Sequence, residues 1–546
     1  MRRHPGSRIA QIIPLLLVNA LVSGLRRRAV PQAHRSPTTE RDFNALRQIR
    51  WAVFALAVTM QHAASGQTLR IALRQDLDIM DPTLATTYVG RIVFAGLCDK
   101  LFDLDEKLNI VPQLATGYEW TNPKVLVIHL RKGVEFQDGE VLDADAVKAT
   151  FMRDLTMPGS YRKSEIGLID RIDVLDPMTI RLDLHAPSGA FLAQLTDRSG
   201  MILAPKAAEA AGKDFARHPV CAGPFSFTER VPQDRVTLER FPGYWDSKDI
   251  HFDRAVYQIQ VNSAVRLANL QAGTSDLTEY VVPSDADTVK QDPKLRLVVS
   301  DALGYVGLVN NVGHGPRANT PYGQNALVRQ ALDLAIDRAA LVNVVFNGMF
   351  IPTVQAVPPS SPFFDAEPKV PVRDLAKAKL LLKQAGVSLP VKIVLTTPNG
   401  SDTLQAAEVI QSMAAEAGFE IRIQAVEFAS SQALTQAGDF EVYLNGWSGR
   451  VDIDGNTYPF LHSNLPNNTM GYDNATVDRL LEQARGMTDV PQRKALYAQM
   501  WPQLRQDLPI TYLWTPRNIV GMSARLTGFR PVPDGMIRVQ GLAMSK

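Results

Sequence analysis

A regular alternation of helix-like and strand-like segments is the strongest constraint on the fold of this 546-residue chain. In its second half, each apolar stretch with helical spacing stops at a glycine, and a strand rich in β-branched residues follows. This alternation is typical of βαβ units and a parallel sheet, so we predict an α/β lobe there. The predicted elements are helix 372–385, strand 391–397, helix 401–417, strand 419–426 and strand 440–447, with stops at Gly386, Gly418 and Gly438.

The first half of the chain has a different pattern. Residues 68–73, 125–130 and 179–184 are short strands with alternating or β-branched side chains, and residues 143–155 have helical spacing with Asp143 as N-cap. A helix at 265–272 ends at a glycine. Up to about residue 215, we therefore expect a mixture of helices and antiparallel strands.

Length and charge limit the class of protein. A chain of this length can form two or more lobes, each with its own core. Of the 58 Lys/Arg and 56 Asp/Glu residues, ten basic and two acidic ones lie in residues 1–66, which leaves residues 67–546 with a formal charge of −6. A slightly acidic body gives no electrostatic basis for binding nucleic acid.

Residues 1–66 have the features of an export signal. Arg47 and Arg50 precede a short apolar stretch, residues 51–60, and small residues then supply a cleavage site near Gly66. We therefore predict a secreted, periplasmic protein.

The residues before this signal leave two interpretations open. An earlier apolar stretch, residues 9–25, contains Pro14 and polar residues that weaken it as a spanning helix. Residues 1–45 are either an over-extended start or a genuine extension with an N-terminal anchor. No cysteine closely follows the apolar stretch 51–60, so lipid anchoring has no support.

The chain contains two cysteines, Cys98 and Cys221. They are either two buried free thiols or, in an oxidising compartment, a disulfide, and we predict the disulfide. The absence of a Cys-x-x-Cys pattern excludes a zinc ribbon and a dithiol redox motif.

The stretch from Cys221 to Asp246 predicts a hairpin. A turn at Gly223-Pro224 starts a strand, a second turn at residues 232–234 starts another, and Phe241, Tyr244 and Trp245 close the end.

This hairpin resembles a pattern of the solute-binding proteins of ABC importers of the peptide/nickel type, family 5. Other blocks match that family in the same order and cover roughly residues 68–530. Most of these residues are turns, caps and core positions rather than ligand contacts. The blocks are residues 69–73 with Asp81-Pro82, residues 110–115, residues 134–139 with Phe151, residues 328–338, residues 376–386 and residues 472–474.

The resemblance implies an α/β protein with the two-lobed periplasmic-binding-protein-like fold of the large, cluster C type. Mixed sheets and a ligand cleft between the lobes belong to that fold, in which the second lobe is inserted into the first. We predict a leader at 1–66, lobe I at 67–306 with an extra subdomain at about 100–215, lobe II at 307–514, and a return to lobe I at 515–546.

The segment from Asn445 to Asn456 is the main candidate for ligand contact, because it leaves the end of a predicted parallel strand. It resembles the family's G-W-x-G-D stretch, where dipeptide-binding members use an aspartate for the peptide's amino group. Arg450 occupies that position here. Either it binds an acidic group of the ligand or it pairs with Asp452 or Asp454; Asp452 could also replace the missing aspartate.

Four further residues are candidates with an open alternative. Trp447 either offers a ring face to the ligand or belongs to the core. Thr86, Thr87 and Tyr88 lie where the cleft loop of the first lobe is expected. Together with Asn445, Arg450 and Asp452, they complete the predicted ligand-binding set.

Other chemistry is excluded by spacing. A calcium-loop-like run at 452–456 has its glycine at position 4 instead of 6, and Ser463 where a bidentate Glu is required. Residues 446–449 do not form a G-x-S-x-G elbow. Histidines 185, 218, 251, 314 and 462 are scattered, so we predict no catalytic residues, no metal ligands and no cofactor.

The resemblance implies a receptor and not an enzyme. Two lobes would close on a peptide or peptide-like solute, and the closed form would dock on the permease subunits of an ABC importer. We expect a monomer that binds no nucleic acid. A chemosensory receptor on the same fold, or a secreted hydrolase, is the alternative.

Overall fold

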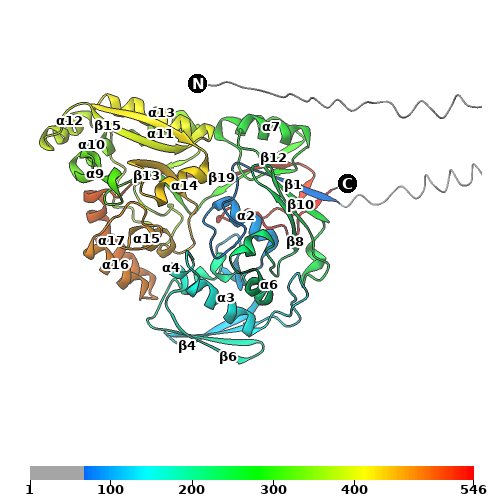
Figure 1. Cartoon of the computed structure of the whole chain (residues 1–546). Helices are drawn as coiled ribbons and strands as arrows, with labels where there is room; N and C mark the ends of the chain where they lie inside the picture. Colours follow the sequence, from blue (N-terminus) through cyan, green and yellow to red (C-terminus); the bar gives the residue numbers. More distant parts are fainter. Residues whose placement is uncertain (1–66, 546) are drawn as a thin grey trace, which may run out of the picture. The chain divides into compact units, whose positions relative to one another are not determined.

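Strand β1 (Thr68–Leu73) lies in the middle of a seven-stranded sheet with the order β12-β19-β11-β1-β10-β9-β8. The computed structural model describes residues 67–545, and these belong to one compact unit (Figure 1). The predicted export signal lies outside the described residues. The other strands of this sheet are β8 (Phe225–Val231), β9 (Arg235–Arg240), β10 (Arg254–Ile259), β11 (Leu277–Thr278), β12 (Leu295–Asp301) and β19 (Arg517–Ser523).

The pairing within this sheet brings distant parts of the chain together. β1 pairs in parallel with β10 and β11, whereas β19, near the C-terminus, pairs antiparallel with β11 and β12. Apolar residues of β1, such as Leu69 and Ile71, are fully buried and pack with Val520 and Met522 of β19 in one core. The last short strands, β20 (Leu526–Thr527) and β21 (Ala543–Met544), pair with each other.

A second sheet has six strands in the order β14-β18-β13-β17-β15-β16. β15 pairs in parallel with β16 and β17, as the sequence pattern predicted, but β13 pairs antiparallel with both of its neighbours. The sheet is therefore mixed and not wholly parallel. Its strands are β13 (Tyr305–Asn310), β14 (Ile351–Pro352), β15 (Val391–Pro398), β16 (Phe419–Val426), β17 (Val442–Trp447) and β18 (Ile510–Thr515).

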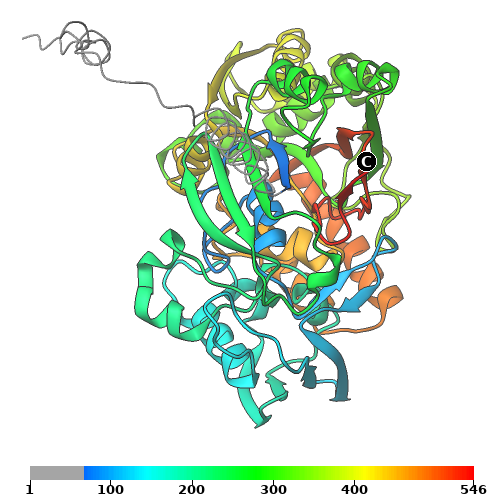
Figure 2. The same cartoon turned by 90° about the vertical axis from the view of Figure 1, so that its right-hand side faces the viewer.

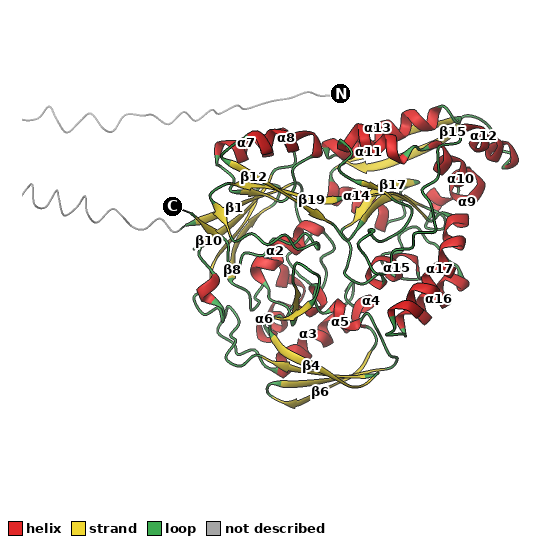
Figure 3. Cartoon of the chain, turned by 180° about the vertical axis from the view of Figure 1, so that it is seen from behind, coloured by secondary structure: helices red, strands yellow, loops and turns green. Residues whose placement is uncertain are grey.

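Helices cover both faces of the second sheet (Figure 3). On one face, the apolar sides of four helices form a core with β15 and β16; these are α10 (Ala326–Ala335), α11 (Arg338–Phe346), α12 (Leu375–Gln384) and α13 (Ser401–Ala415). On the other face, Tyr305 and Tyr512 pack against three more; these are α15 (Asp454–Leu461), α16 (Ala475–Arg485) and α17 (Val490–Asp507).

A four-stranded antiparallel sheet with the order β4-β5-β7-β6 forms a third core with α3 (Ala144–Thr156). It occupies the end of the unit that is cyan in Figure 2. Its strands are β4 (Ala115–Asn122), β5 (Val125–Leu130), β6 (Ile169–Asp176) and β7 (Thr179–Leu184). Short elements around it and the first sheet are β2 (Phe102–Leu104), β3 (Ile110–Pro112), α2 (Tyr88–Leu97), α4 (Lys163–Ile166), α5 (Phe191–Gln194), α6 (Pro205–Ala211), α7 (Ser263–Ala272) and α8 (Ala286–Gln291). Two further helices, α9 (Pro321–Gln324) and α14 (Phe428–Gln436), contact β15 of the second sheet.

The chain passes between the two largest sheets at two short connections. Residues 302–304 join β12 to β13, and Pro516 alone joins β18 to β19. Two neighbouring connections of this length suit a hinge, since a few residues at element ends can absorb the change in backbone angles. The two sheets with their helices are therefore two lobes.

Helix ends follow their caps more closely than their hydrophobic pattern. The side chain of Asp143 accepts a hydrogen bond from Ala146 N and starts α3, as predicted. By contrast, α12 begins at Leu375 and not at 372, because the side chain of Asp374 caps it through Lys377 N. Val372, which the pattern counted as helical, is 86% exposed.

The predicted hairpin is β8 and β9, and its end is fixed to the segment after α2. Cys98 and Cys221 form a disulfide. Next to it, the buried carboxylate of Asp99 accepts hydrogen bonds from the Tyr244 hydroxyl at 2.9 Å and the Trp245 indole N–H at 2.8 Å. The aromatic residues at the end of the hairpin thus contribute polar atoms as well as ring contacts.

Replacing Asp99 with asparagine is expected to change how stability depends on pH. Burial raises the pKa of Asp99 to about 7, although hydrogen bonds from Trp245 and Tyr244 oppose the shift. Between about pH 4 and pH 7 the folded state then holds a proton that the unfolded chain releases, so the parent loses stability as the pH rises. Asp99→Asn does not titrate and should gain stability relative to the parent across this window in urea denaturation; a difference independent of pH would contradict this.

Candidate functional site

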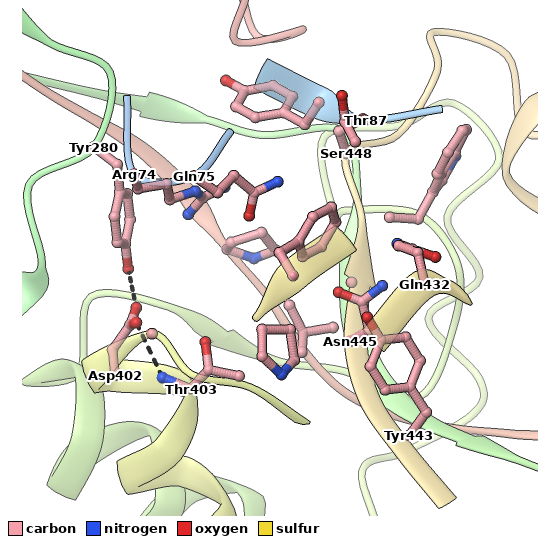
Figure 4. Close-up of a pocket in the computed structure, with 18 of the residues that line it drawn as sticks. Arg74, Gln75, Thr87, Tyr280, Asp402, Thr403, Gln432, Tyr443, Asn445 and Ser448 are labelled. Atoms are coloured by element: carbon pink, nitrogen blue, oxygen red, sulfur yellow. Dashed lines mark hydrogen bonds between the residues drawn. The ribbon is translucent and has the colours of Figure 1, made fainter. Parts of the chain in front are cut away.

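A cavity of about 440 Å³ is lined by residues from both lobes. Figure 4 shows Arg74, Thr87 and Tyr280 from the first lobe opposite Tyr443 and Asn445 from the second. Its wall mixes aromatic rings with a small number of charged and amide groups, which is the usual composition of a pocket for a small molecule.

Strand β17 supplies one side of the cavity. Tyr443, Asn445 and Trp447 alternate along the strand and therefore point to the same face, and all three line the cavity. The indole N–H of Trp447 donates to the carbonyl of Gly455 and to Oδ1 of Asn456, both at 3.1 Å. The ring is thereby held in place.

The start of α2 supplies part of the opposite side. The hydroxyls of Thr86 and Thr87 donate to Asp78 at 2.8 and 2.9 Å, and all of Thr86, Thr87 and Tyr88 line the cavity. Tyr88 donates its hydroxyl to the carbonyl of Gly535 at 2.7 Å. Gly535 has φ +72°, and a Cβ there would lie 2.3 Å from the Tyr88 hydroxyl, so this close approach requires glycine.

None of the charged residues that line the cavity was predicted from the sequence; they are Arg74, Arg266, Glu279, Asp402, Glu427 and Arg517. Arg74 follows β1 directly, and its guanidinium carbon lies 4.5 Å from the ring centre of Tyr280. Asp402 is in the first turn of α13, after the carboxyl end of β15, and accepts a hydrogen bond from the Tyr280 hydroxyl at 2.6 Å. The signal available for Asp402 was its place just after a predicted strand, where open α/β sheets bind ligands.

The structure does not bring Arg450 to the cavity. The side chain is buried, and its Nε lies 3.2 Å from Oδ2 of Asp197, which also binds Arg91 at 2.6 Å. The pair with Asp452 or Asp454 that the sequence suggested is not formed, because Arg450 pairs with Asp197 instead. Arg450 does not line the cavity in which a ligand acid is expected. Asp197 precedes Arg450 by some 250 residues and also binds Arg91 of α2, a helix that packs in the core of the first sheet, so Asp197 links the two lobes.

Asp452 is also occupied elsewhere. Its carboxylate binds Arg493 of α17 at 2.6 and 2.7 Å, and Asp454 binds Arg485 of α16 at 2.8 Å. Both acids belong to ion pairs that fix α15 to α16 and α17. Asp452 does not line the cavity. Its carboxylate is already bound to Arg493 and does not take the place of the aspartate that dipeptide-binding family members use for the peptide's amino group.

Around Asp197 the buried arginines outnumber the buried acids. Arg162 binds Glu165 at 2.8 Å, while burial and then the charge of Arg162 hold the pKa of Arg198 well below its usual value. The pKa of Asp197 lies well below its usual value, because Arg450, Arg91 and Arg198 outweigh the effect of burial. The cluster consists of Arg91, Arg162, Arg198, Arg450, Asp197 and Glu165.

The described part of the chain shows no side-chain cluster suited to a metal site and no helix suited to a membrane span. Within residues 67–545, no group of three or more His, Cys, Asp or Glu side chains is arranged to hold a metal ion. In the same range, no helix has both the length and the apolar character needed to cross a bilayer. Ser448, the serine of the Gly446–Gly449 run, accepts a hydrogen bond from Arg91 at 3.0 Å.

Two lobes, two connecting segments and a cavity with walls from both lobes define a two-lobed binding protein. The family model described as "Bacterial extracellular solute-binding proteins, family 5 Middle" matches residues 109–468. The chain belongs to this family, as its sequence motifs indicated. The family is one of solute-binding proteins, and this chain is a solute-binding receptor.

Known relatives match nearly the whole chain. The glutathione-binding protein GsiB of Pectobacterium atrosepticum is 28% identical over 504 residues, which cover 89% of this chain and 96% of that protein. The periplasmic binding protein DppA of Helicobacter pylori, solved with the peptide STSA, is 26% identical with a TM-score of 0.81 and covers 88% of this chain and 98% of its own. The murein tripeptide binding protein MppA of Escherichia coli, 20% identical with a TM-score of 0.82 and covering 88% and 99%, shares the fold.

Proposed function

We propose that this protein is the solute receptor of an ABC importer, which captures a peptide-like solute by closing its two lobes and delivers it to a membrane permease. The observation that supports this most is the cavity with walls from both lobes, which two short connections join. A solute that contacts both walls stabilises the closed form by its difference in affinity for the closed and open forms.

The cavity suits a small peptide-like solute. Its volume lies in the range of about 300–1,000 Å³ found for pockets that hold small molecules. The names of two relatives refer to glutathione and to a peptide. Small peptides of this kind have charged groups at their ends and apolar surface between them. Tyr443 and Trp447 offer apolar contact area, and Asn445 offers amide hydrogen bonds.

The remaining features of the proposal concern where and how the protein acts. Relatives include periplasmic binding proteins, and we propose that residues 51–66 export this chain to the same compartment. We propose that it acts as a monomer, by binding alone and without a cofactor, and that permease subunits are its protein partners.

Binding and closure can be measured on the purified protein. Native mass spectrometry, compared with the denatured mass, identifies a solute that stays bound through purification. Isothermal titration with glutathione and a panel of dipeptides and tripeptides should then give a dissociation constant of about 1 μM or tighter for at least one compound, or about −8 kcal/mol. The same compound should reduce the radius of gyration in solution scattering. If no solute is retained and no compound binds, the receptor function is wrong.

Asn445 provides a specific check on the location of the site. Its side chain lines the cavity and accepts no hydrogen bond among the described residues. Asn445→Ala should weaken binding of the retained solute by roughly 2- to 12-fold, the equivalent of one hydrogen bond. Unchanged affinity would place the solute elsewhere in the molecule.

A further inference from the structure

Arg74 and Asp402 approach one part of the cavity from opposite lobes, and Tyr280 lies between them (Figure 4). The ring of Tyr280 packs against the guanidinium of Arg74, while its hydroxyl donates to the carboxylate of Asp402. One side chain thus sets the spacing between a cationic and an anionic group.

The guanidinium of Arg74 has donors to spare. It lies between the rings of Tyr280 and Tyr88, at 4.5 and 5.6 Å from their centres, and its Nε is 3.5 Å from Glu279. Among residues 67–545, neither of its two terminal nitrogens has a hydrogen-bond partner. A guanidinium held by two rings presents a planar pair of N–H groups, which fits a carboxylate.

The carboxylate of Asp402 has acceptors to spare. It receives the Tyr280 hydroxyl and the backbone N–H of Thr403 at 3.0 Å. In the described part of the chain no lysine or arginine lies within ion-pair distance of it. An ionised carboxylate accepts about four hydrogen bonds, so room remains for a cationic donor.

Tyr280 is a neutral donor at physiological pH. Burial and then the charge of Asp402 hold the pKa of Tyr280 well above its usual value. The tyrosine therefore keeps its proton and orients the side chain of Asp402 by donating to it.

We propose that Arg74 and Asp402 together bind an α-amino-acid head group, with its carboxylate on Arg74 and its ammonium group on Asp402. This inference rests on the proposed receptor function and narrows its ligand to solutes that carry both groups on one carbon atom. Free amino acids and γ-linked glutamyl peptides have this head group. In an α-linked peptide the amino group and the carboxylate are at opposite ends of the molecule.

The position of the two residues links recognition to closure. Arg74 belongs to the first lobe and Asp402 to the second, so a head group that satisfies both must bridge the lobes. A solute with only one of the two charges engages one lobe and leaves the spare hydrogen-bonding capacity of the other residue unused, which lowers its affinity for the closed form.

Two isomeric dipeptides test the proposal. γ-Glutamylglycine and α-glutamylglycine have the same atoms and charges, but only the γ-linked isomer keeps the amino group and carboxylate on one carbon. By isothermal titration the parent should bind the γ-linked isomer roughly 10- to 100-fold more tightly, the equivalent of one charged hydrogen-bonding group. Arg74→Gln and Asp402→Asn should each remove most of this preference.

Matched controls come from an exposed ion pair that lines no part of the cavity. Arg317 and Asp439 are 3.0 Å apart and about half exposed, so Arg317→Gln and Asp439→Asn remove the same charges and should keep the preference. Equal affinity for the two isomers, or an unchanged preference in Asp402→Asn, overturns the head-group assignment. If the protein binds another solute without this head group, the assignment fails but the receptor function stands. If it binds no solute at all, the receptor function fails as well.

Discussion

Replacing Asp197 with asparagine is expected to cost about 3–5 kcal/mol of stability, the typical effect of removing one partner from a buried ion pair. Asp197 is 2% exposed and is the shared partner of Arg91 in the first lobe and Arg450 in the second. The asparagine variant keeps the shape but leaves buried arginines in excess. Because one of these ion pairs joins the lobes, ligand affinity should fall and the ligand-bound protein should be more expanded in solution scattering.

The design of this experiment depends on pH and on a matched control. Since the pKa of Asp197 lies well below its usual value, its contribution is fully present at neutral pH and is lost as the pH falls below about 4. Urea denaturation near pH 7 is therefore suitable. Asp439→Asn, which breaks an exposed ion pair, should cost no more than about 1 kcal/mol. Equal losses in the two variants would show that the Asp197 cluster does not hold the lobes together.

Local sequence patterns predicted the elements of the second lobe well. Strands at 391–397 and 419–426 and a helix from residue 401 are confirmed within a few residues, because short-range periodicity and glycine stops determine them. The direction of β13 was not predictable in this way. It pairs antiparallel with β17 and β18, which follow it by more than a hundred residues, and no local pattern encodes that pairing.

The same limit explains what was missed at the site. Asn445 and Trp447 could be proposed because they lie near the end of a predicted strand, and Thr86, Thr87 and Tyr88 because the family resemblance places a cleft loop there. The environment of Arg450 could not be predicted. Its partner Asp197 is remote in sequence and belongs to a cluster of charged residues that only the folded chain brings together.

Arg74 and Asp402 show the converse. In the sequence, neither residue belongs to a recognisable motif. Only the folded chain places both beside Tyr280, which contacts the guanidinium of Arg74 and donates a hydrogen bond to Asp402. A charged residue becomes a candidate for ligand binding when the fold places it in a cavity wall and leaves part of its hydrogen-bonding capacity unused.

Removing the Cys98–Cys221 disulfide is expected to have the second large effect, a loss of about 2–5 kcal/mol. The bond closes a loop with a sequence separation of 123 residues, which contains the whole third sheet. Without it the unfolded chain gains conformational freedom, and the C-terminal end of α2 loses its covalent link to the hairpin. Urea denaturation of the Cys98→Ser/Cys221→Ser variant measures the loss.

Two further variants separate the bond from its surroundings. Both cysteines are almost fully buried, so serine also places hydroxyls in an apolar core, whereas Cys98→Ala/Cys221→Ala does not. If the missing covalent bond causes the destabilisation, Cys98→Ala/Cys221→Ala should lose nearly as much free energy of unfolding, relative to the parent, as the serine variant does. Because α2 begins at Tyr88 in the cavity wall, a loosened helix should also weaken solute binding by a few fold, less than Asp402→Asn does. A parent and alanine variant of equal stability would show that the bond contributes nothing to the fold, and the hydrogen bonds from Tyr244 and Trp245 to Asp99 would then hold the hairpin end alone.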